Sequence, residues 1–169
     1  MGSSADAMLV FGIDIGDEEG YGTLGPLTTK YDEIKTDWWD PDADNEPDGE
    51  NEEASEWPGF AGRLIEALAA RVGWPAGCLD DESVETYVER TYGVEIVSWG
   101  HYDHPHHILA AAGEPFQINS GGWGLHHLTV AELVPDGHVE ASAKLSAALD
   151  TLGLTTTHAP GWLLVADYG

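Results

Sequence analysis

One acidic stretch, residues 32–57, constrains the fold of this chain more than any other feature of the sequence. It holds twelve Asp and Glu residues and a single lysine, and it is interrupted by Pro41, Pro47 and Gly49. Carboxylates at this density repel one another, and too few apolar side chains are present to offset the entropy lost on folding. We therefore expect an irregular acidic insert, with the regular structure formed by the segments on either side of it.

The negative charge extends beyond this stretch to the whole chain of 169 residues, whose formal net charge is −25. Nucleic acids and anionic membrane surfaces are bound through clustered Lys and Arg, so this charge argues against both as direct partners. The longest apolar runs are about five residues, far below the ~20 that a membrane span needs. No basic segment followed by a long apolar segment opens the sequence, so we expect a cytoplasmic protein.

Apolar residues at helical spacing predict three helices. The first spans residues 60–72. The second takes Asp80 or Asp81 as its N-cap and ends at Gly93. The third spans residues 137–152, and its predicted inner face carries Val139, Leu145, Ala148 and Leu152.

Short apolar or alternating runs predict strands at 8–14, 94–99, 108–112, 116–118 and 162–165. Residues 100–105 have turn chemistry, which predicts that the strands on either side of them form a β-hairpin. Together these elements predict a single α+β domain over residues 1–169. Its mainly antiparallel sheet has about four or five strands and is accompanied by about three helices, with residues 32–57 as an acidic insert.

Two segments resemble a group of small, uncharacterised, acidic bacteriophage and prophage proteins. They are residues 92–111 (YGVEIVSWGHYDHPHHILAA) and residues 160–169 (PGWLLVADYG). Members of that group similarly pair a "YGVE" strand with a "Y/H-I-L-A" strand and finish on "GW…YG". The resemblance covers roughly the C-terminal half of the chain. It implies a phage or prophage origin and carries no functional residues across.

Alternating acids in the insert predict a surface that binds a basic partner. In an extended chain, residues two apart point the same way about 6.6 Å from each other, so these acids would form a row of carboxylates. Such a row mimics the phosphates of DNA and would bind and block a basic, nucleic-acid-handling host protein, with two tryptophans as aromatic anchors. The predicted partner-binding residues are Trp38, Trp39, Asp40, Asp42, Asp44, Glu46, Asp48, Glu50, Glu52 and Glu53.

Other interpretations of the acidic stretch stay open. A solvated loop would carry the charge only for solubility, and halophilic adaptation would enrich acids along the whole chain. Carboxylates at alternate positions from Asp40 to Asp48 also suit weak Ca²⁺ binding. A loop counted from Asp40 or from Asp44 does not supply the full set of ligands of an EF-hand.

The histidines suggest an alternative function, a metal-binding protein or a metal-dependent enzyme. All eight lie between residues 101 and 158, and four of them fall within seven residues. Histidines on one face of a strand, completed by Asp103 or by a residue of the pair His126–His127, could bind zinc or another divalent transition metal. The candidate ligands are His101, Asp103, His104, His106 and His107. The competing interpretation is a structural or solvent-facing cluster, because Pro105 interrupts the strand and no established ligand spacing is present.

No catalytic motif points to an enzyme. Ser98, Ser120 and Cys78 could each meet a histidine in three dimensions, but none lies in a nucleophile elbow or another activating motif. We therefore expect a non-enzymatic inhibitor without a cofactor, whose partner is a basic host protein. An oligomeric structural protein is a third possibility.

Overall fold

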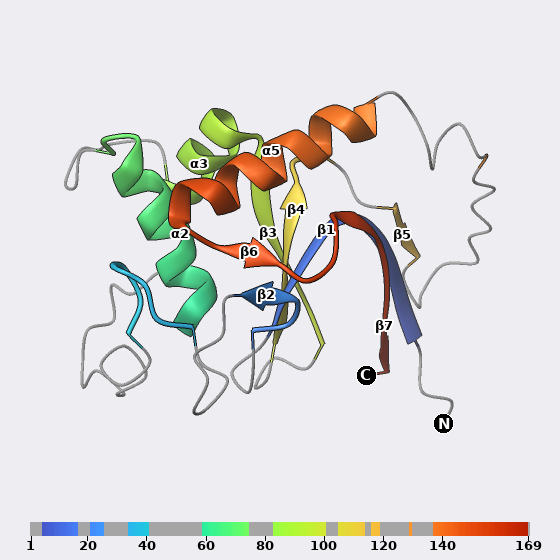
Figure 1. Ribbon diagram of the computed structural model, residues 1–169. Coiled ribbons are helices and arrows are strands. Elements are labelled where there is room, and N and C mark those ends of the chain that lie inside the picture. Colours follow the sequence, from blue (N-terminus) through green and yellow to red (C-terminus); the bar gives the residue numbers. More distant parts are fainter. Residues whose placement is uncertain are drawn as a thin grey trace.

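Three helices pack on one face of a bent, mainly antiparallel sheet, as Figure 1 shows. This computed structural model describes residues 5–16, 21–25, 34–40, 59–74, 83–100, 105–113, 116–118, 129 and 137–168. The helices are α2 (Gly59–Arg71), α3 (Val84–Tyr92) and α5 (Gly137–Leu152). The strands are β1 (Ala5–Gly16), β2 (Leu24–Gly25), β3 (Val94–Trp99), β4 (His106–Ala111), β5 (Phe116–Ile118), β6 (Thr155–Thr156) and β7 (Gly161–Tyr168). The predicted α+β class and the antiparallel sheet are confirmed.

Strand β1 is the centre of the five-stranded sheet. Residues 7–9 pair with both β5 and β7, and Gly12 pairs with both β4 and β7. Strands β4 and β5 therefore share one edge of β1, and β7 occupies the other. The predicted hairpin is confirmed, since β3 runs antiparallel to β4 with Val94 opposite Ala111. Strands β2 and β6 form a separate pair.

Strand β1 arches as it passes from β7 to β4 (Figure 1). Gly12 lies at this passage, where a Cβ atom would come within 2.6 Å of the Leu109 carbonyl oxygen and 2.7 Å of the Ile108 Cγ2. Only a residue without a side chain allows the backbones to approach so closely. The glycine therefore makes the bend of the central strand possible.

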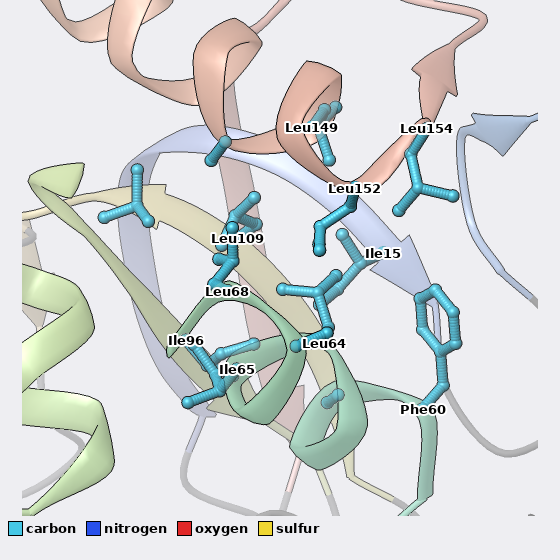
Figure 2. Close-up of a cluster of buried hydrophobic side chains, with 14 of the residues drawn as sticks. Ile15, Phe60, Leu64, Ile65, Leu68, Ile96, Leu109, Leu149, Leu152 and Leu154 are labelled. Atoms are coloured by element: carbon cyan, nitrogen blue, oxygen red, sulfur yellow. The ribbon is translucent and has the colours of Figure 1, made fainter. Parts of the chain in front are cut away.

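The main core lies between the helices and the face of the sheet that they cover. In Figure 2, Leu64, Ile65 and Leu68 of α2 and Leu149 and Leu152 of α5 gather around Ile15, Ile96 and Leu109 of the sheet. Alternation along each strand brings these sheet residues to one face. Burial of apolar area at this interface is the main stabilising contribution to the fold.

A smaller core lies on the opposite face of the sheet. Val10, Ile108 and Ala110 are its buried residues, and side chains of β3 and β7 pack against them. These two strands lie on opposite sides of the central pair β1–β4, so the bend of the sheet brings both toward the same cluster. The sheet therefore buries its second face by curling.

The helices differ from the sequence expectations at two positions. The N-cap of α3 is Ser83, whose Oγ accepts a hydrogen bond from the Thr86 N–H at 3.3 Å, and not Asp80 or Asp81. Val139 was expected on the inner face of α5 but is 78 % exposed, because this first turn lies outside the main core. The predicted stop at Gly93 is confirmed by its left-handed φ of 67°. Within the described residues, no helix is both long and apolar enough to cross a membrane.

Candidate functional site

The adjacent tryptophans Trp38 and Trp39 of the acidic stretch pack into the protein's own core. Trp39 is 2 % exposed, and its Nε1 donates a hydrogen bond to the Tyr21 hydroxyl at 3.1 Å. Trp38 is half-buried, and its Nε1 donates to the Leu152 carbonyl oxygen at 3.1 Å. Both rings also contact Phe60, at centroid distances of 5.5 Å for Trp38 and 5.3 Å for Trp39. The expectation that Trp39 anchors a partner is corrected, because its ring is not accessible, while an anchoring role of the half-buried Trp38 stays a prediction.

A compact turn holds the start of the acidic stretch. The Thr36 Oγ1 accepts hydrogen bonds from the backbone N–H groups of Trp38 and Trp39, at 3.3 and 3.0 Å. The Thr36 N–H donates to the Trp39 carbonyl oxygen at 3.0 Å. Asp40 closes this segment with an ion pair to Lys35 at 2.6 Å. The other predicted acidic contacts, Asp42, Asp44, Glu46, Asp48, Glu50, Glu52 and Glu53, lie outside the described residues.

Two aromatic residues that flank residues 41–58 in the sequence lie close together. Trp39 precedes this segment and Phe60 follows it, and their rings meet edge to face at an interplanar angle of 80°. Residues 41–58 contain eight acids and no basic residue. The fold therefore brings together, beside the first turn of α2, the two described segments that precede and follow this acidic block in the sequence.

Each described Lys or Arg side chain already contacts a group of its own chain. The ion pairs are Lys35–Asp40 at 2.6 Å, Arg63–Glu66 at 3.1 Å, Arg71–Asp37 at 2.5 Å and Lys144–Glu140 at 2.8 Å, while the Arg90 guanidinium lies 5.1 Å from the centre of the Tyr87 ring. The hydrogen bond from Lys144 lowers the pKa of Glu140. Exposed pairs of this kind add little stability. Because these contacts engage each described Lys and Arg, the described residues form no basic patch that would offset the large excess of acids.

Of the five predicted metal ligands, the structure describes only His106 and His107, and it does not bring these two together. His101, Asp103 and His104 lie outside the described residues. His106 and His107 are neighbours on β4, so their side chains point to opposite faces of the sheet. This pair therefore cannot ligate one ion together. Within the described ranges, no group of three His, Cys, Asp or Glu residues is placed to hold a metal ion.

His106 instead pairs with Asp14, which sequence reasoning did not single out. The His106 Nε2 lies 2.7 Å from the Asp14 Oδ1, and the same oxygen accepts a hydrogen bond from the Gly16 N–H at 2.9 Å. A carboxylate only accepts hydrogen bonds, so the Nε2 carries the proton. The Trp99 ring lies 5.0 Å from the imidazole. The one available signal was an acidic residue inside an otherwise apolar strand.

His107 pairs with Ser98 on the helix-covered face. The Ser98 Oγ lies 2.7 Å from the His107 Nδ1, and His107 is 5 % exposed. This hydrogen bond gives the buried histidine a polar partner within the fold. Of the three nucleophile candidates, Ser98 thus meets a histidine, in a structural arrangement, while Ser120 and Cys78 lie outside the described residues.

The surroundings of Glu95 raise the pKa of its carboxyl group. Burial raises its pKa above the ordinary value of 4.5, and the neighbouring charge of Glu89 raises it further. The opposing influence is the Gly113 N–H, which donates to the Glu95 Oε1 at 3.1 Å. This hydrogen bond from Gly113 holds the chain that follows β4 against Glu95, which suits a structural role for the carboxylate.

Comparison with known proteins adds no relative to this description. No protein-family model matches the chain, and no curated protein or solved structure matches it either. The bacteriophage resemblance of residues 92–111 and 160–169 accordingly stays an expectation. What the chain offers for a functional conclusion is its own charge and geometry.

Proposed function

We propose that the protein is a non-enzymatic polyanion, of the DNA-mimic type, that binds and blocks a basic, nucleic-acid-handling host protein. A phage or prophage counter-defence role would fit this activity. The observation that carries the proposal is the charge imbalance. The net charge is −25, and each described Lys or Arg side chain is already engaged by an acid or a ring of the same chain.

The physical consequence of this imbalance is long-range attraction of a basic surface. A single-signed field speeds the encounter with an oppositely charged partner and weakens as salt screens it. Residues 41–58, which carry eight of the acids, follow in sequence a segment that Trp39 fixes in the core. The tryptophans serve this function indirectly, by fixing the base of the acidic stretch.

Two variants with the same change in charge test the proposal. In one, Asp42, Asp44, Glu46 and Asp48 become Asn or Gln. In the matched control, the substituted acids are Glu66, Glu85, Glu89 and Asp150, which lie on the three helices. Each immobilised protein is exposed to host lysate at low salt, and bound proteins are eluted with duplex DNA or with high salt.

The expected result is a basic protein that the parent and the helix variant retain, that the acidic-stretch variant loses, and that duplex DNA elutes. Equal loss from both variants would mean that net charge alone matters, and would refute a role for residues 41–58. A partner that DNA does not displace would refute mimicry. Elemental analysis of the same protein tests the alternative, since zinc at near one equivalent per chain would favour the histidine hypothesis.

A further inference from the structure

One edge of strand β7 is not paired by any described strand. β7 pairs with β1 from Gly161 to Tyr168, in register from Gly12 to Ala5, and with no other described strand. An edge strand presents N–H and C=O groups that can pair with an added strand. From Leu163 to Asp167, this edge is therefore a template for an extended segment of another chain.

An exposed leucine lies on this strand. Leu164 is 75 % exposed, and its register partner is Leu9. Two residues earlier on the same face, the Trp162 ring packs against Phe11 and His138, at centroid distances of 5.6 and 5.2 Å. Helix α5 packs mainly on β1, β3 and β4 and reaches β7 through the contact of His138 with Trp162; among the described residues, the same face of β7 continues from this aromatic cluster to the exposed Leu164.

Charge decides which kind of chain fits the edge. β7 contains Asp167 and no basic residue, and Asp167 is in register with Asp6 of β1. A second copy of this chain would bring two net charges of −25 together, which opposes pairing of β7 with itself. A segment with Lys or Arg at alternate positions would meet an attractive field instead.

We infer that the basic partner docks an extended segment, with alternating apolar and Lys or Arg residues, on the edge of β7 that no described strand pairs. Its backbone pairs with residues 163–167, and an apolar side chain opposite Leu164 covers that leucine. The inference rests on the proposed function and adds a second contact to it. The acidic stretch attracts the partner, and β7 fixes the register of one strand.

Two peptides of equal charge serve as probes. One alternates Lys and Val, which forms an extended strand with one apolar side; the other alternates Lys and Pro, which lacks the backbone N–H groups at every second position. Binding is measured by the fluorescence anisotropy of labelled peptide. Hydrogen exchange of residues 163–167 locates the contact.

The protein variant for this test is Leu164→Glu, and Ala70→Glu on the exposed side of α2 is its control. Both add one negative charge at an exposed position. Covering Leu164 should contribute about tenfold in affinity, so Leu164→Glu should weaken the Lys–Val peptide by about that factor. The control should bind it as tightly as the parent or more so. The β7 amides should be protected by the Lys–Val peptide alone.

The outcomes separate this inference from the proposed function. If both peptides bind equally, depend on salt and leave the β7 amides unprotected, the polyanion proposal survives and the β7 contact is refuted. The β7 contact is likewise refuted if Leu164→Glu and Ala70→Glu bind the Lys–Val peptide with the same affinity. If neither peptide binds at low salt, attraction of basic chains itself fails, and both proposals fall.

Discussion

Replacing Trp39 tests the conclusion that this residue belongs to the core. In the folded protein its indole fills a site between Tyr21 and Phe60, with the Nε1 bonded to the Tyr21 hydroxyl at 3.1 Å. Trp39→Ala removes the whole ring from a position that is 2 % exposed. We expect a large loss of stability, because neighbours held by the sheet and α2 cannot collapse fully into the vacated volume.

The magnitude follows from burial and from the hydrogen bond. Removing a buried Trp or Phe side chain costs about 3–5 kcal/mol. That is a large part of the roughly 5–15 kcal/mol that stabilises a typical domain, so Trp39→Ala brings the chain close to unfolding. Trp39→Phe keeps an aromatic ring and loses the Nε1 donor. We expect it to cost about 1–2 kcal/mol, because the Tyr21 hydroxyl then loses its partner.

Urea unfolding followed by circular dichroism measures both variants against the parent. The midpoint should fall in the order parent, Trp39→Phe, Trp39→Ala, with the slope unchanged if the transition stays two-state. Trp39→Phe should capture the basic partner as well as the parent does. An unchanged midpoint for Trp39→Ala, or a loss of partner capture by a fully stable Trp39→Phe, would refute a core role and restore the tryptophan as an anchor.

Three further variants test other parts of the structure. Gly12→Ala should lower the free energy of unfolding by about 1–3 kcal/mol, because its Cβ would meet the β4 backbone. Gly161→Ala on the facing strand should lower it much less, because the nearest atom to its Cβ would be 3.9 Å away. Equal losses of stability in urea unfolding would contradict the close approach of β1 and β4 at Gly12. Asp14→Ala should cost about 1–3 kcal/mol through the lost acceptor, and a double-mutant cycle with His106→Ala should show coupling; additive losses would mean that the pair contributes nothing. Burial raises the pKa of Glu95 in the folded state, so the protein loses stability as the pH rises from 4.5 through that raised pKa. Glu95→Gln should therefore be more stable than the parent at pH 7, by less than about 1 kcal/mol, and should lose this advantage well below pH 4.5. A difference in thermal midpoint between the two proteins that stays constant across pH would contradict the raised pKa.

The elements predicted from sequence are those whose signal is local. The hairpin of β3 and β4 follows from alternation and a turn sequence, and α5 begins and ends where its spacing predicts. The length of β1 was underestimated, because its first residues are ordered by pairing with β7, far away in sequence. Local periodicity does not contain that partner.

The candidate site was less predictable, because its contacts join distant segments. Trp38 and Trp39 are flanked by acids in the sequence, which predicts a surface position. Their burial depends on contacts with Tyr21, Phe60 and Leu152, which lie elsewhere in the sequence. Asp14 and His106 are 92 residues apart. Only the pairing of β1 with β4 brings them together, and no spacing rule within the sequence predicts that contact.

The pairing of β1 also bears on how the protein reaches its native state. The central strand comes from the start of the described chain, yet β7, which pairs along one whole edge of it, comes from residues 161–168. Contacts this distant in sequence close a large loop and slow folding. During synthesis, the β7 edge of β1 stays unpaired by β7 until residues 161–168 have left the ribosome, so among the described strands the one made last completes the sheet.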